Sequence, residues 1–93
     1  MDSRTSRLLS PAERFYVGAS DEDRREIDRI VNNLAVDPTV NNQTTFFLSV
    51  PPVILSVYSD GRFWVVYHLP DSFELRVMNI GHAGTKPTPH APR

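Results

Sequence analysis

The chain has 93 residues, 40% of them hydrophobic, a formal net charge of -1 and no cysteine. This length supports one small domain with a modest core and leaves no room for a second domain. The lack of cysteine excludes a disulfide framework and a thiolate metal site, and the nearly neutral charge argues against tight binding driven by phosphate contacts.

The first predicted helix begins near residue 10. Residues 1–9 are mostly polar and predict either a frayed arm or a short edge strand. In the segment that follows, Ser10 is expected to cap the helix, Pro11 suits its first position and Glu13 completes a capping box. The helix is expected to stop near Gly18.

A second helix is predicted to begin at Ser20 and to end at Asp37-Pro38, because proline disfavours helical geometry in the residue before it. The acidic residues 21–23 lie where the helix dipole favours negative charge. Charges of alternating sign over residues 24–29 indicate a solvent-exposed side. The apolar residues recur with a period of about 3.6 and predict one buried stripe: Ile27, Ile30, Val31 and Leu34.

The second half of the chain predicts β-structure. Residues 44–48 are β-branched and aromatic and predict a short strand or an extended approach to one. Three further strands are expected, over residues 54–58, 63–69 and 74–80, and Gly81 closes the last of them. Residues 63–69 are apolar on both faces, which favours the centre of the sheet.

Asp60-Gly61 is a preferred pair for the two central residues of a hairpin turn. A tight turn there pairs Tyr58 with Phe63 and Leu55 with Val66, and it divides the apolar residues between two faces. One face carries Tyr58, Phe63, Val65 and Tyr67. The second face carries Leu55, Val57, Trp64, Val66 and His68. Because two helices cover only one face, the second is expected to be an open apolar surface that binds a partner.

These elements predict an α+β fold in which an N-terminal helical hairpin packs on one face of a small antiparallel β-sheet. Residues 1–83 are expected to form a single domain, and residues 84–93 a flexible, proline-rich tail. No apolar run approaches the roughly 20 residues of a membrane helix, and no signal-peptide core is present. We therefore expect a cytoplasmic protein without membrane partners.

Three segments in this order form a recognisable pattern: Leu34 to Pro38, Gly61 to Tyr67, and Ile80-Gly81-His82. Over residues 12–83 the chain resembles the RelE/ParE superfamily of type II toxin–antitoxin toxins. The resemblance implies a toxin that is neutralised by a cognate antitoxin protein. RelE-like members of the superfamily cut messenger RNA on the ribosome, whereas ParE-like members act on DNA gyrase.

Catalytic members of that superfamily commonly carry arginine at two positions where this chain differs. Trp64 stands at the first of them, and Ala83 stands after the Gly-His pair at the second. A terminal helix or tyrosine usually follows, where this chain has its proline-rich tail. The resemblance therefore implies an RNA endonuclease site with degenerate catalytic residues, and enzymatic activity is left open.

Cleavage of RNA needs a general acid or base and a cation that stabilises the phosphate charge. The candidate catalytic residues are His82, Arg76, Arg62 and Tyr67. His82 matches the Gly-His position of the family, or it stabilises the end of the sheet. The two arginines bind phosphate in a bidentate manner, or they are ordinary exposed charges. Tyr67 matches the family's strand tyrosine, or it packs in the core.

The candidate partner-binding residues are Trp64, Val66 and His68, with a place in the core as the alternative for Trp64. No cofactor is predicted, and His68 and His82 are too isolated to indicate a zinc site. Three hypotheses remain: a toxin bound by an antitoxin and with weak or no ribonuclease activity, a non-enzymatic interaction module, and a gyrase-directed poison.

Overall fold

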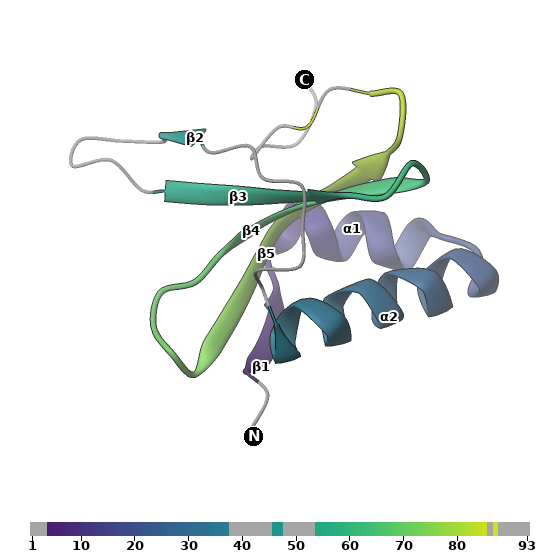
Figure 1. The fold of residues 1–93 in the computed structure, drawn as a ribbon. Helices are drawn as coiled ribbons and strands as arrows, with labels where there is room; N and C mark the ends of the chain where they lie inside the picture. The colour runs from purple at the N-terminus through teal and green to yellow at the C-terminus, as the bar shows by residue number, and fades with distance from the viewer. Residues whose placement is uncertain (1–3, 38–45, 48–53, 86, 88–93) are drawn as a thin grey trace.

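The computed structural model describes residues 4–37, 46–47, 54–85 and 87. A short strand leads into two helices, and the remaining strands follow (Figure 1). The elements are β1 (Thr5–Leu8), α1 (Ser10–Gly18), α2 (Asp21–Val36), β2 (Phe46–Phe47), β3 (Ile54–Ser59), β4 (Phe63–His68) and β5 (Glu74–His82). The predicted tail, Lys86 included, lies almost wholly outside the described residues.

The five strands of the described residues form one sheet in the order β1-β5-β4-β3-β2. The pairs from β2 to β5 are antiparallel as predicted, but β1 pairs with β5 in parallel, so the sheet is mixed. The N-terminal segment is therefore an edge strand. Backbone hydrogen bonds hold it, from Thr5 N to Phe73 O at 2.8 Å and from Leu9 N to Val77 O at 2.9 Å. Such bonds ignore side-chain identity, so the polar sequence of β1 did not reveal its partner.

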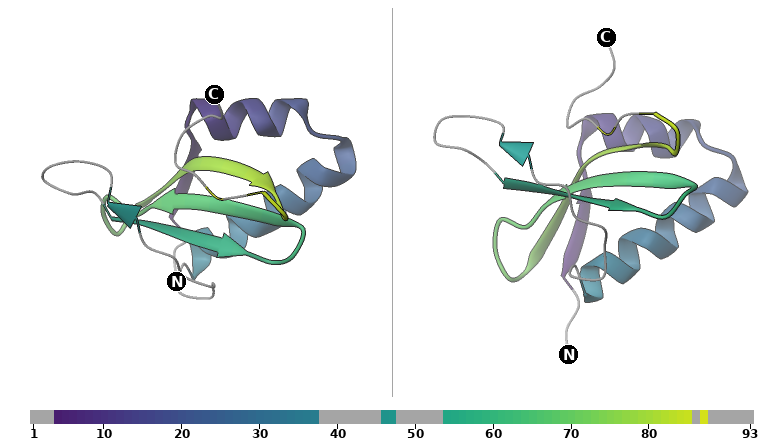
Figure 2. Two further views of the ribbon diagram at one scale, coloured as in Figure 1. Left: turned by 90° about the horizontal axis from the view of Figure 1, so that it is seen from above. Right: turned by 45° about the horizontal axis from the view of Figure 1, so that its top comes forward.

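The two helices cover one face of the sheet (Figure 2). Their buried side chains and those of the central strands form the main core, whose described members are Ala12, Ile27, Ile30, Val31, Leu34, Ala35, Phe63, Val65, Tyr67, Leu75, Val77 and Ile80. The predicted stripe of the second helix is thus buried as expected. The α+β layering that the sequence predicted is confirmed.

The two helix starts differ in how they are capped. The side chain of Ser20 accepts a hydrogen bond from Asp23 N at 3.2 Å, as predicted for the cap of α2. Ser10, however, is the first residue of α1, and Leu9 occupies the cap position without a side-chain hydrogen bond. The predicted capping box is therefore wrong. Because Leu9 N–H is bonded to β5, the strand pairing continues up to the residue at which the helix begins.

The hairpin between β3 and β4 turns one residue later than predicted. Asp60 N donates to Phe63 O at 3.2 Å, so Gly61 and Arg62 are the central residues. Only Gly61 has a positive φ, of 86°, as in a type II′ turn. The Asp60 carboxylate explains the shift, since its Oδ1 accepts from the backbone N–H groups of Arg62 and Phe63, both at 3.0 Å.

The pairs predicted for this hairpin are therefore wrong, while the assignment of faces is right. Tyr58 lies opposite Val65 instead of Phe63, and Val57 lies opposite Val66. This is a shift of two residues, and a shift of two leaves every side chain on its predicted face. Between β4 and β5, a bulge after Val66 leaves Met78 as an extra residue, so that Val77 and Ile80 both face the helices.

The second face of the sheet is not the open apolar surface that the sequence predicted. Leu55, Val57, Trp64 and Val66 form a second buried cluster against Met78, and none of the four is more than 6% exposed. Exposed large apolar side chains in the described ranges lie elsewhere, at Val17, Val36 and Phe73.

Removing the hydroxyl of Ser20 is expected to destabilise the protein, because one N–H group at the start of α2 then loses its acceptor. Ser20→Ala should lower the free energy of unfolding by about 1 kcal/mol. Ser10→Ala is the matched control, since that side chain makes no capping bond. Urea denaturation of both variants measures the difference. Equal losses would contradict the cap assignment.

Acid is expected to weaken the β3–β4 turn. Burial alone would raise the pKa of Asp60, but hydrogen bonds from Phe63 N, Arg62 N and Tyr58 outweigh it and lower that pKa below its usual 3.8. A lowered pKa in the folded state gives stability that is fully present above the unfolded-state pKa and is lost as pH falls through the folded value. The acid loss of stability should be smaller in Asp60→Asn than in the wild type; identical pH profiles from thermal unfolding would contradict this.

Candidate functional site

His82 lies at the end of β5, opposite Phe63 at the start of β4. The centroid of its imidazole is 4.9 Å from that of Phe15, in an edge arrangement, and 5.6 Å from that of Phe63. The residue itself is exposed to solvent. Two aromatic rings, one from α1 and one from β4, thus orient an accessible imidazole at this end of the sheet.

Arg62, in the hairpin turn, is engaged with the start of α2. Its guanidinium forms ion pairs with Asp23 and, at 3.6 Å, with Glu22, and it lies 5.3 Å from the centroid of the Phe63 ring. The hydrogen bond to Asp23 raises the pKa of Arg62 further. Two carboxylates already compensate this charge, so a phosphate would have to compete with them. The contacts serve to tie the turn to α2.

Tyr67 points into the main core and is 1% exposed. Burial raises the pKa of its hydroxyl, against the opposite effect of a hydrogen bond with the Ser56 side chain. The phenol therefore stays protonated at neutral pH and out of contact with solvent. The packing role that the sequence left open as the alternative accounts for this position.

Arg76 lies on the other face of the sheet, since its neighbours Leu75 and Val77 are buried against the helices. Its Nε is 3.1 Å from Glu74 Oε1, and its side chain is 40% exposed. The side chains of Arg76 and His82 thus face opposite sides of the sheet. Because Arg62 is paired and Tyr67 is buried, the four candidate catalytic residues do not converge on one site.

Trp64 occupies the position where the resemblance implies a catalytic arginine, and it is part of the second buried cluster. Its indole lies flat against Gly81, where an added Cβ would lie 2.0 Å from Cζ2. Nε1 donates to Thr85 Oγ1 at 2.8 Å, and Thr85 Oγ1 donates to His82 O at 2.6 Å. Trp64 therefore holds the chain that follows β5 against the sheet.

The candidate partner-binding residues lie on one face of the sheet but differ in solvent exposure. Val66 is fully buried, Trp64 is 6% exposed, and only His68, at the end of β4, is partly exposed. A direct role of the first two in binding stays a prediction, and their burial leaves little surface for it.

Sequence reasoning missed Gly81 and Thr85 as the contacts of Trp64. Gly81 had a signal, because a glycine inside a strand often marks a close approach. Thr85 had none, since its contact depends on a turn in which Gly84 adopts a φ of 94°.

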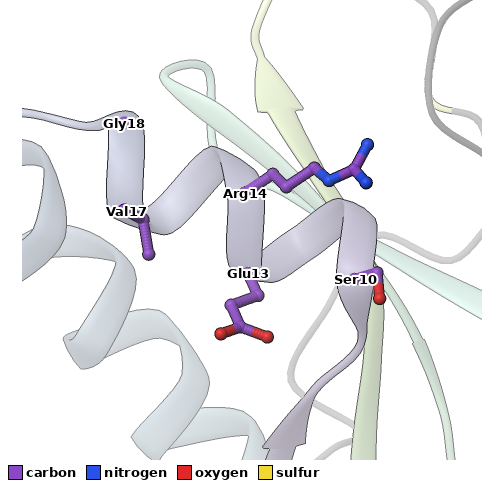
Figure 3. A pocket seen from close by; sticks show the side chains of 5 residues that line it. All are labelled: Ser10, Glu13, Arg14, Val17 and Gly18. Atoms are coloured by element: carbon purple, nitrogen blue, oxygen red, sulfur yellow. The ribbon is translucent and has the colours of Figure 1, made fainter.

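A shallow hollow runs along the outer surface of α1 (Figure 3). It is lined by Ser10, Glu13, Arg14, Val17 and Gly18, of which Val17 is 65% exposed. Glu13 and Arg14 point away from each other, so the hollow does not present a single charged centre (Figure 3). It contains none of the candidate catalytic residues.

In the described ranges, no three histidine, aspartate or glutamate side chains lie close enough together to bind a metal ion. None of the helices in this part of the chain has the length and apolar character of a membrane span.

Because Trp64 lies so close to Gly81, a single methyl group added at Gly81 is expected to destabilise the protein. Gly81→Ala should cost roughly 1–3 kcal/mol, because the ring and the strand must move apart. Gly18→Ala is the control, since an added Cβ there meets nothing within 4 Å. Denaturation followed by Trp64 fluorescence measures both. A stable Gly81→Ala protein with unchanged emission would contradict the packing.

Neither a family model nor a curated protein matches this sequence. Among solved structures, a chain of the toxin–antitoxin complex RelBE2 from Mycobacterium tuberculosis is similar, with a TM-score of 0.72. The alignment covers 91% of this chain and 97% of that one, at 13% sequence identity. A structural match at so low a sequence identity shows a shared fold and nothing further. The chain thus has the fold of a chain in that complex, in agreement with the α+β architecture that the sequence predicted.

Proposed function

We propose that this chain is the toxin component of a type II toxin–antitoxin system, bound by an antitoxin protein, and that it does not cut messenger RNA. The observation that carries the first part is the likeness to a chain of the RelBE2 complex over nearly the whole of both chains. A match of this extent includes the order of strands and helices, and not only a shared motif.

The second part rests on where the candidate catalytic groups lie. A ribonuclease must place a cation and a proton-transfer group around one phosphate, within hydrogen-bond reach of the reacting atoms. Here the Arg76 side chain lies on the face opposite to His82, and the buried Tyr67 keeps its proton. Arg62 is close to the same sheet end as His82, but two carboxylates of α2 compensate its charge.

Trp64 supports the same conclusion. At the position where catalytic members of the RelE/ParE superfamily carry arginine, this chain has an indole that packs on Gly81 and bonds to Thr85. This indole is buried, carries no positive charge and has its one N–H group engaged by Thr85, so it does not replace the arginine as a stabiliser of developing phosphate charge. The site is thus built around packing instead of around a cation.

Expression from an inducible promoter in a bacterium tests the proposal. Growth should stop, messenger RNA should stay intact, and co-expression of an antitoxin encoded beside the gene should restore growth. The His82→Ala and Arg76→Ala versions should arrest growth as the wild type does. Northern blots and growth curves measure these outcomes.

Two results would contradict the proposal in different ways. Cleavage of messenger RNA that is lost in His82→Ala or Arg76→Ala would show that the chain is a nuclease after all. Normal growth at full expression would remove the toxin role and leave the non-enzymatic interaction module. Arg25→Ala, which changes an exposed charge on α2, controls for effects of charge removal alone.

A further inference from the structure

The guanidinium of Arg62 and the imidazole of His82 both lie against the ring of Phe63. The Cζ atom of Arg62 is 5.3 Å from the centroid of that ring, and the imidazole centroid is 5.6 Å from it. The backbone joins the two residues as well, because Phe63 pairs with His82 and Ala83 N donates to Arg62 O at 2.9 Å. A cation and an imidazole are therefore held at the same end of the sheet, on the side that the helices cover.

The imidazole of His82 is oriented by its neighbours, but its ring nitrogens are free to bond. Phe15 and Phe63 pack against the ring. Within the described part of the chain, His82 accepts hydrogen bonds at its backbone oxygen, and none involves a ring nitrogen. A neutral imidazole donates through one ring nitrogen, and a protonated one donates through both. Because His82 is exposed, this donor is accessible to an anion from solvent.

The guanidinium of Arg62, in contrast, is held at the one nitrogen that an anion needs most. Asp23 and Glu22 both contact Nη2, Glu22 at 3.6 Å. A guanidinium binds an oxyanion in a bidentate manner through Nη2 and one of its other two nitrogens. The two carboxylates therefore compete directly with an external anion for Arg62.

The start of α2 adds a second positive potential at this place. Asp23 and Glu22 belong to the first turn of α2, and the N-terminus of a helix carries a partial positive charge. The Arg62 guanidinium brings a full positive charge to the same turn. Without the two carboxylates, these positive charges would face each other, and an anion between them would be stabilised. The carboxylates thus take the place that an external anion would otherwise have.

We propose that Asp23 and Glu22 form an autoinhibitory contact, in which two carboxylates of α2 mask an oxyanion site made by the Arg62 guanidinium and the His82 imidazole. The masked ligand is a single phosphate group, since phosphate carries more negative charge at neutral pH than one carboxylate and offers several acceptor oxygens. The inference goes beyond the proposed function and does not depend on it, because it concerns the binding of an anion and no bond is made or broken.

Neutralising Asp23 should unmask the site. In the full chain, Asp23→Asn removes the charge but keeps the side-chain shape and the backbone N–H that bonds to Ser20. Its affinity for inorganic phosphate should exceed that of the wild type about tenfold, the effect expected when one unit charge next to the anion is removed. An NMR titration with phosphate, at constant pH and ionic strength, measures this affinity at the backbone amides of Arg62 and Ala83.

Asp21→Asn is the matched control. It removes the same charge from the same helical turn, but Asp21 pairs with Arg24, at 2.7 Å, and not with Arg62. Its phosphate affinity should equal that of the wild type. Adding Arg62→Gln or His82→Gln to Asp23→Asn should abolish the gain. Circular dichroism verifies that each variant is folded.

Glu22→Gln gives an independent arm of the test. The Glu22 side chain is 84% exposed and that of Asp23 only 25%, so the change at Glu22 is the smaller risk to the fold. Its gain in phosphate affinity should be smaller than that of Asp23→Asn, because Glu22 lies farther from Nη2.

Three results would overturn the inference: equal phosphate affinity in Asp23→Asn and Asp21→Asn, a gain that persists after Arg62→Gln or His82→Gln, or, should Asp23→Asn not fold, no gain in Glu22→Gln. The titration needs neither toxicity nor an antitoxin. Normal growth on expression therefore refutes the proposed function alone, and a failed titration refutes the masked site alone.

Discussion

Strand β5 hydrogen-bonds to β4 on one side and to β1 on the other, and its apolar residues Leu75, Val77 and Ile80 are buried against the helices. Burying each such side chain contributes roughly 1.5–3 kcal/mol, more than any single ion pair on this surface. The strand thereby positions side chains at both ends of the sheet. His82 and the Trp64 contact at Gly81 lie at one end of β5, and Arg76 lies in register with Arg7 and His68 nearer to the other.

The sequence predicted those parts of the fold that depend on local patterns. The stripe of α2, the Ser20 cap, the three strands from residue 54 onward and the division of the β3–β4 hairpin into two faces follow from periodicity and turn chemistry. The place of β1 did not follow, because a parallel edge strand of four mostly polar residues is selected by backbone bonds to a strand that is distant in sequence.

The candidate site was harder to predict than the fold for a related reason. Strand position tells which face a residue occupies, but not whether a carboxylate from elsewhere pairs with it. Arg62 is an example, since its partners Glu22 and Asp23 come from α2. The strand pattern predicts an open face for Trp64 because it identifies only the helices as cover, whereas the turn after β5 brings Thr85 to its indole nitrogen.

A comparison of interaction energies explains why two arginines lie in register on β1 and β5. A like-charged pair in register costs a fraction of a kcal/mol to about one, whereas a leucine contributes up to roughly 1.5–3 kcal/mol when it is buried, and Leu8 of β1 packs against the main core. A shift of β1 by one residue against β5 would separate the arginines but turn Leu8 from the main core to the other face. The register is therefore set by the core, and Arg7 and Arg76 are held together as a consequence.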